Sequence, residues 1–270
     1  MVRRVDSEIG GWQTASVSAV EVVGLVLAGI GGGLTGSVAG LASLVTYPSL
    51  LAVGLPPVTA NVTNTVSLMF GSVGTILGSR PELAGQRRHV QRLAIAGIVG
   101  GAAGGALLLH TPGDSFEKAV PWLIGTAALA ILVRRRLVEV SIEEGHRHPH
   151  PDVGPGVLTA VGAVGIYGGY FGAGAGVMLL ALILFVTGDP LPRANAVKNV
   201  VLGLANGVAA ISFIIFGPVR WSVVAPLGLG LLLGGRLGPI IVRRAPQAPL
   251  RVGIAVAGLG LAIKLGFDAY

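Results

Sequence analysis

The sequence has few charged residues: 11% of its 270 residues are Asp, Glu, Lys or Arg, while 52% are hydrophobic. An ordinary soluble domain carries roughly 25% charged residues, which cover its surface. Charged residues and His are absent altogether from residues 22–79 and 153–188. Because a bilayer-spanning helix needs only about 20 apolar residues, these runs exclude a soluble globule and predict an all-α, polytopic membrane protein.

Three further absences narrow the function. The chain has no Cys, which excludes disulfides, thiolate catalysis and Cys-ligated metals. No His lies inside an apolar run to act as the base of an intramembrane hydrolase, so we expect neither an enzyme nor a cofactor. Carboxylates are missing from the middle of every apolar segment, although proton-driven carriers typically have an intramembrane Asp or Glu. We interpret His146, His148 and His150 as part of a solvated linker rather than a metal site.

The positive charges lie in short connectors between apolar runs. A net charge of +7 would suggest nucleic acid as the partner of a soluble protein. In connectors, however, positive charge sets membrane orientation, so we expect a multi-pass protein of the cell (inner) membrane that contacts the lipid bilayer and no nucleic acid. Continuously apolar runs favour helices over the alternating strands of a barrel. About eight segments are predicted, at 20–53, 58–79, 93–110, 118–133, 155–187, 194–216, 221–241 and 250–267.

The apolar segments fall into two similar halves. A tail, residues 1–19, precedes a first half at 20–133, and a polar connector at 134–154 separates it from a second half at 155–270. Residues 33–40 align with 169–176, and Asn61 aligns with Asn195. Weak internal repeats are typical of many transporter folds. We therefore predict two homologous four-segment repeats.

Segments one and five are too long for a straight span, and each contains a cluster of glycines. Clustered glycine favours a break in a helix, and non-helical backbone inside a bilayer must be buried in protein or line a cavity. A broken helix presents free N–H groups that bind anions. The predicted anion-binding glycines are Gly32, Gly33 and Gly36 in segment one, and Gly172 and Gly174 in segment five. The alternative is close helix packing through small residues, which we assign to Gly97, Gly101 and Gly105.

Segments two and six begin with polar side chains that could complete such a site. Amides and hydroxyls donate hydrogen bonds to an oxyanion, and a buried lysine adds charge. The candidates are Asn61, Thr63 and Asn64 in segment two, and Asn195, Lys198 and Asn199 in segment six. The alternatives are helix capping and interhelical hydrogen bonding for the amides, and snorkelling to the membrane surface for the lysine.

These motifs resemble those of a known family. Residues 31–41, 46–51 and 54–66 look like the first half of the TauE/SafE, or sulfite exporter, family, and residues 168–176 and 195–199 look like its second half. The resemblance covers roughly residues 20–267 without the central connector. It implies a membrane transporter of two four-segment modules that moves sulfite, organosulfonates and related small anions, commonly outward. Ser37, Val38 and Ala39 depart from the family's richer glycine run, which implies a differently shaped first site.

We therefore expect a small anion as substrate, moved outward, with an anion channel or a structural membrane subunit as alternatives. The orientation of the halves stays open. If segments one and five each cross once, the halves are parallel. If both are re-entrant hairpins, the halves are inverted, and the positive-inside rule does not separate the two arrangements. The oligomeric state also stays open, with a homodimer among the alternatives.

Overall fold

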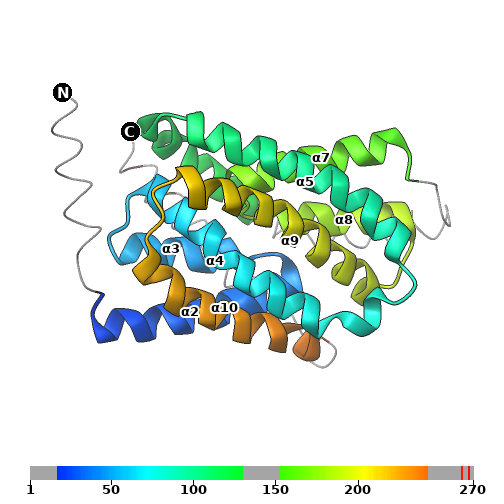
Figure 1. The fold of residues 1–270 in the computed structure, drawn as a ribbon, viewed down its shortest axis with the longest axis horizontal. Coiled ribbons are helices and arrows are strands. Elements are labelled where there is room, and N and C mark those ends of the chain that lie inside the picture. The colour runs from blue at the N-terminus through cyan, green and yellow to red at the C-terminus, as the bar shows by residue number, and fades with distance from the viewer. Residues whose placement is uncertain (1–16, 130–152, 243–262, 264–266, 268–270) are drawn as a thin grey trace.

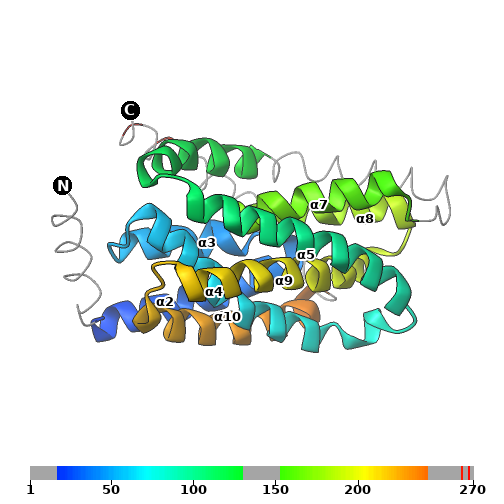
Figure 2. The ribbon, with the colours of Figure 1, turned by 45° about the horizontal axis from the view of Figure 1, so that its top comes forward.

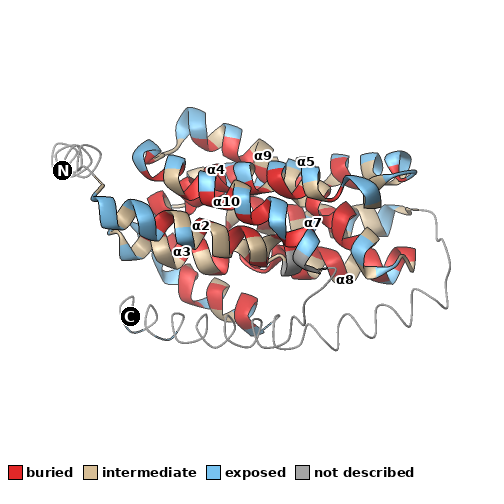
Figure 3. Ribbon diagram, turned by 90° about the horizontal axis from the view of Figure 1, so that it is seen from below, coloured by how far each residue is buried: buried red, intermediate tan, exposed pale blue. Residues whose placement is uncertain are grey.

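The chain folds into an elongated bundle of helices (Figure 1). The computed structural model describes residues 17–129, 153–242, 263 and 267, and every regular element within these ranges is helical. Four of these helices are long and apolar enough to cross a membrane, at Ala19–Ser37, Arg87–His110, Leu191–Phe216 and Trp221–Ile240. Large apolar side chains such as Trp122 and Phe216 are exposed. Figure 3 shows how exposed and buried residues are distributed along the helices. For the described residues, the predicted all-α architecture with helices that can span a membrane is thus confirmed. The His-rich tract, most of the central connector and most of segment eight lie outside the described residues.

The first long apolar run forms a helical hairpin. Helix α2 (Ala19–Ala39) begins with a capping box in which the Ser18 and Glu21 side chains bond each other's backbone. It ends at Gly40, whose φ of 73° is a left-handed conformation that favours glycine. Helix α3 (Ala42–Ala52) then runs back along α2, so that Gly36 faces Ala42 and Gly32 faces Thr46.

The fifth run has the same form. Helix α7 (Pro155–Tyr170) stops before a short non-helical segment in which Gly172 and Gly174 have φ of 79° and 78°. The Tyr167 hydroxyl donates to the Ala173 carbonyl at 2.6 Å and ties this segment to α7. Helix α8 (Ala175–Thr187) then packs against α7 (Figure 2).

Longer helices connect and enclose these hairpins. In the first half, α4 (Pro57–Gly78) leads through the short η1 (Arg80–Leu83) to α5 (Arg87–His110), and residues 113–129 form a further helix. In the second half, α9 (Leu191–Phe216) is followed by α10 (Trp221–Val242). Helix α5 begins at Arg87, whereas the apolar segment was predicted to begin at residue 93. Arginines fit on the first turns of this helix, because their long side chains can extend to the membrane surface.

Glycine contacts show how the helices pair. Helix α10 packs in parallel against α2 and α4, and α5 packs in parallel against α7 and α9. A Cβ on Gly33 would collide with the α10 backbone at Gly235, and one on Gly101 would collide with α9 at Ala205. The packing role predicted for Gly97, Gly101 and Gly105 is confirmed, since all three face α9. Each half therefore contributes one helix to the other half's set.

The two sets meet along α4 and α9, which run in opposite directions. Val62 of α4 lies beside Gly217 at the end of α9, and Ser72 lies beside Gly203 near its middle. The hairpins also touch: a Cβ on Gly40 would lie 2.5 Å from the Cα of Gly176 at the start of α8. The ends of the two hairpins are therefore in backbone contact inside the bundle.

Candidate functional site

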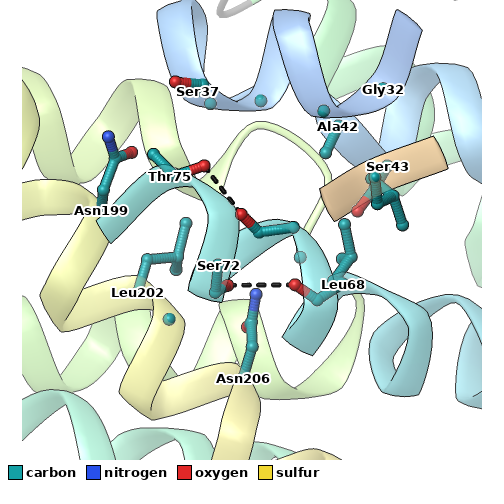
Figure 4. A pocket seen from close by; sticks show the side chains of 17 residues that line it. Gly32, Ser37, Ala42, Ser43, Leu68, Ser72, Thr75, Asn199, Leu202 and Asn206 are labelled. Carbon is teal, nitrogen blue, oxygen red and sulfur yellow. Dashed lines mark hydrogen bonds between the residues drawn. The ribbon is translucent and has the colours of Figure 1, made fainter. Parts of the chain in front are cut away.

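A cavity of about 60 Å³ lies beside the turn between α2 and α3 (Figure 4). It is lined by α4 from Leu68 to Thr75 and by α9 from Asn199 to Asn206, and α10 contributes Leu231. These positions lie between the middle of the bundle and the end at which α4 stops and α9 begins. The cavity also reaches Gly172 of the second hairpin, so both hairpins and both halves form its wall.

Three residues of the cavity wall carry a buried polar atom without a hydrogen-bond partner. The Ser37 hydroxyl, the Asn199 Nδ2 and the Asn206 Oδ1 are buried and unpaired, and all three residues line the wall. A buried unpaired polar group costs about 1–3 kcal/mol. By contrast, the Ser72 and Thr75 hydroxyls donate to carbonyls of their own helix, at 3.0 and 2.8 Å (Figure 4). Ser37, Asn199 and Asn206 therefore leave hydrogen-bonding capacity unused beside the cavity.

The start of α3 adds backbone donors to the same wall. The first N–H groups of a helix lack intrahelical partners, and no side chain caps α3 at Leu41. Ala42 and Ser43, the first two residues of α3, both line the cavity. The positive end of the helix dipole therefore faces the cavity as well.

Two residues of α9 cap the end of α2. The Asn195 Nδ2 donates to the Ser37 carbonyl at 2.9 Å, and the Lys198 Nζ donates to the Gly36 carbonyl at 3.3 Å. The Gly36 carbonyl also accepts from the Gly40 N–H at 2.8 Å, and carbonyls at a helix C-terminus attract cations. The side chain of Lys198 is 1% exposed, so its charge lies inside the bundle, one residue before Asn199. Neither capping residue lines the cavity.

The polar residues of α4 make equivalent structural contacts. The Asn61 Nδ2 donates to the carbonyl of Tyr170, the last residue of α7, at 2.8 Å. The Asn64 side chain joins α4 to α3 by accepting from Thr46 and donating to Ser43 at 3.2 Å. The Thr63 hydroxyl accepts from the backbone N–H of Arg220 at 3.1 Å. These three residues fix the hairpins and the α9–α10 turn.

The structure thus divides the predicted site residues into two groups. Those that line the cavity are Gly32, Gly33, Gly36, Gly172 and Asn199. Those that lie around it and position the helices are Asn61, Thr63, Asn64, Gly174, Asn195 and Lys198. Gly174 is the N-cap of α8 and faces Ala127, where a Cβ would lie 3.1 Å from the alanine Cβ. A role of either group in substrate binding stays a prediction.

Several lining residues were not among the predicted ones. The polar ones are Ser37, Ser43, Ser72, Thr75 and Asn206. The spacing along the sequence could have identified Ser72, Thr75 and Asn206. Leu68, Gly71, Ser72 and Thr75 have the i, i+3, i+4, i+7 spacing of one helix face. Asn199, Leu202, Gly203 and Asn206 repeat that spacing on α9. Small and polar residues at these positions mark the cavity-facing stripe of each helix.

An aromatic cluster lies on the other side of the α2–α3 turn. The ring of Tyr47 on α3 meets that of Phe171 edge-on, with centroids 5.4 Å apart, and Phe116 packs against Tyr170 and Phe171. Tyr47 follows Thr46, whose hydroxyl bonds the Asn64 side chain on α4. Asn64 lies closer to the start of α4 than the cavity-lining residues of that helix do. The cluster therefore fills the bundle between the cavity and the end at which α4 begins.

Among the described residues, no group of three or more His, Asp or Glu could hold a metal ion.

Comparison with known proteins places the chain in a family. Residues 25–265 match the model of the sulfite exporter TauE/SafE family. The chain is 30% identical over 239 residues to the probable membrane transporter protein YfcA of Escherichia coli (strain K12), covering 88% of this chain and 87% of that protein. It is 28% identical over 244 residues to the probable membrane transporter protein ORF9 of Sinorhizobium sp, with 87% and 88% covered. No solved structure matches the chain significantly. The chain therefore belongs to the TauE/SafE sulfite exporter family of membrane transporters.

Proposed function

We propose that the protein moves a small oxyanion such as sulfite across the cell membrane, and that it binds this anion in the cavity beside the α2–α3 turn. The observation that carries the proposal is the set of unpaired polar groups on Ser37, Asn199 and Asn206. The uncapped start of α3 adds N–H donors, and the buried charge of Lys198 lies nearby. No carboxylate lines this cavity among the described residues, so an anion would meet no like charge.

The size of the cavity supports a small substrate. A volume of about 10–15 Å³ by the same measure admits one water molecule. At about 60 Å³ the cavity therefore has room for roughly four to six waters, which suits a four-atom ion such as sulfite. An organosulfonate with a carbon chain would need the cavity to widen.

The membrane potential supports outward movement. Because the cell interior is negative, exporting one negative charge is favourable by about 2.3 kcal/mol per 100 mV. In the described helices, carboxylates lie only near the ends, as at Glu21 and Glu117. An anion exporter needs no intramembrane carboxylate for proton coupling, so this distribution agrees with potential-driven export.

We further propose that the halves are homologous modules in inverted orientation, each entering the membrane as a broken hairpin. The antiparallel course of α4 and α9 supports this arrangement. Described lysines and arginines near the end at which α4 stops and α5 begins are Arg80, Arg87, Arg88, Arg92, Arg193 and Arg236. Only Lys118 and Arg220 lie near the opposite end in the described part of the chain. By the positive-inside rule the first end faces the cytoplasm.

The test is sulfite efflux from loaded proteoliposomes that contain the full chain, followed with a sulfite-reactive dye outside. Asn199→Leu replaces the unpaired amide by an apolar group of similar size, and we expect efflux to fall at least tenfold. Ser37→Ala removes an unpaired hydroxyl, so it should slow efflux while leaving the thermal midpoint equal or higher. A purely structural role would not separate these two effects.

The matched control is Ser212→Ala. The Ser212 hydroxyl donates to the carbonyl of Val208 in its own helix and lies outside the cavity. Efflux through this variant should equal that of the unmodified protein. If Asn199→Leu and Ser37→Ala also leave the rate unchanged, the cavity is not the binding site. If the unmodified protein releases no sulfite, the substrate is another anion or the chain does not transport.

A further inference from the structure

A second cavity, of about 680 Å³, lies at the end of the bundle where α5 and α9 begin. Its wall includes three arginines, Arg88 and Arg92 of α5 and Arg193 of α9. Asp189 is the one carboxylate among the described residues that line it, and it lies 3.8 Å from Arg193. One of the three positive charges is thus balanced, and the described residues of the wall keep a surplus of positive charge.

An apolar strip continues from this cavity along α5. Arg88, Arg92, Ile95 and Val99 follow at intervals of four, three and four residues, which places them on one face of the helix. Ile95 lines the cavity, and Ile95 and Val99 are each 64% exposed on the outside of the bundle. In a membrane protein such exposed side chains face lipid tails. The cavity therefore lies at the Arg88 end of a lipid-facing surface.

The second cavity is separate from the central one. The two share no lining residue, and they lie on different sides of α9. The central cavity lies between α9, α4 and the α2–α3 turn, whereas the second uses α5, the end of α8 and the start of α9. An anion bound by Arg88 and Arg92 would therefore lie outside the central cavity.

We propose that this cavity binds the phosphate headgroup of an anionic phospholipid, with an acyl chain lying along Ile95 and Val99. Guanidinium groups are suited to phosphate because they donate two parallel hydrogen bonds. Basic pockets between transmembrane helices at the cytoplasmic surface bind anionic headgroups. The cavity volume lies within the 300–1,000 Å³ that is usual for small-ligand sites. A free anion would gain nothing from the apolar strip, which is why we favour a lipid.

The test is a titration of the purified full chain in a neutral detergent with phosphatidylglycerol, read by native mass spectrometry. Each basic residue near an anionic headgroup contributes about 1 kcal/mol, which corresponds to about fivefold in affinity. Arg88→Gln combined with Arg92→Gln should therefore weaken binding of the first lipid about thirtyfold. Ile95→Ser should weaken phosphatidylglycerol binding but leave any binding of inorganic phosphate unchanged.

The matched control is Arg80→Gln combined with Arg87→Gln. It removes the same charge from the same end of the bundle, but neither residue lines the cavity. This pair should bind phosphatidylglycerol within about threefold of the unmodified protein. Equal weakening by both pairs, equal binding of phosphatidylcholine, or full competition by inorganic phosphate at the same concentration as the lipid would each overturn the lipid site. These outcomes do not depend on which anion the protein transports.

Discussion

Asn61 near the start of α4 and Asn195 near the start of α9 each cap a helix of the other half. The Nδ2 of Asn195 donates to the carbonyl of Ser37 at the end of α2, and the Nδ2 of Asn61 donates to the carbonyl of Tyr170 at the end of α7. In both side chains the Oδ1 is buried without a hydrogen-bond partner. The reciprocal contact ties the two hairpins to the long helices on which the cavity depends.

Removing either cap should destabilise the protein. Asn195→Ala or Asn61→Ala leaves a buried helix-end carbonyl unpaired, which costs about 1–3 kcal/mol. For a protein of this size, that corresponds to a thermal midpoint about 5 °C lower. Thermal unfolding in detergent measures the change, and Ser212→Ala, which removes a bond within one helix, should shift the midpoint by less than half as much. An equal shift in all three variants would contradict the capping role.

Gly40 should tolerate no side chain, because a Cβ there would collide with the second hairpin. Gly54 provides the matched control for this prediction. Both have left-handed backbone, with φ of 73° and 82°, so Ala at either position costs about 1–2 kcal/mol of strain. A Cβ on Gly40 would also collide with Gly176, whereas nothing lies within 4 Å of a Cβ on Gly54. Gly54→Ala should yield folded protein in size-exclusion chromatography, and Gly40→Ala should not. Equal yields would mean that the two hairpins do not touch at this point.

The relative orientation of the halves can be read by labelling single cysteines. Because the chain has no Cys, Ala84→Cys and Pro192→Cys each introduce one reactive thiol at an exposed position. In the inverted arrangement both lie on the cytoplasmic side, so an impermeant maleimide should label both only after the cells are permeabilised. Gly113→Cys, at the opposite end of α5, should be labelled in intact cells. Labelling of Pro192→Cys but not Ala84→Cys in intact cells would establish parallel halves.

The charge of Lys198 should matter for anion affinity. Lys198→Met keeps a long apolar stem and removes the charge, so the apparent KM for sulfite should rise about tenfold, which is about 1.4 kcal/mol. Lys198→Arg keeps the charge and should restore most of the affinity. The readout is sulfite efflux at varied internal concentration, with thermal midpoints recorded for both variants. A fall in maximal rate with unchanged KM in Lys198→Met would indicate that the lysine only holds the Gly36 carbonyl.

Leu202 should limit the size of the substrate. It lines the cavity between Asn199 and Asn206, one helical turn from each, and Leu202→Ala removes three carbon atoms from the wall. Efflux of a two-carbon sulfonate should rise relative to that of sulfite by at least tenfold. Leu204→Ala is the control, because Leu204 is 41% exposed and does not line the cavity. An unchanged preference in Leu202→Ala would mean that this cavity does not select the substrate.

The helices could be predicted from the sequence because charge-free apolar runs leave a chain few alternatives in a membrane. Their pairing could not. Gly33, Gly74 and Gly101 all present the same small face, and the sequence does not indicate that the first two meet α10 while the third meets α9. The antiparallel course of α4 and α9 was equally hidden, because charge counts were the same for both orientations.

The candidate site, too, could be predicted only in part from the sequence. Gly32, Gly36 and Asn199 were identified from their recurrence in both halves, and they line the cavity. Asn61 and Asn195 recur just as clearly, yet they bond helix-end carbonyls. A side-chain amide donates equally well to a backbone carbonyl or to an oxyanion, so its partner depends on which groups the tertiary structure brings within reach.

The exchange of α5 and α10 between the halves has a consequence for biosynthesis. Helix α5 is translated with the first half, but the helices against which it packs, α7 and α9, follow the central connector. Until they are inserted, the small-residue face at Gly97, Gly101 and Gly105 has only lipid beside it. Neither half can therefore complete the packing of its helices alone, because the α5 and α10 contacts need helices of both halves. A chain truncated at the connector would leave that face without its α7 and α9 partners.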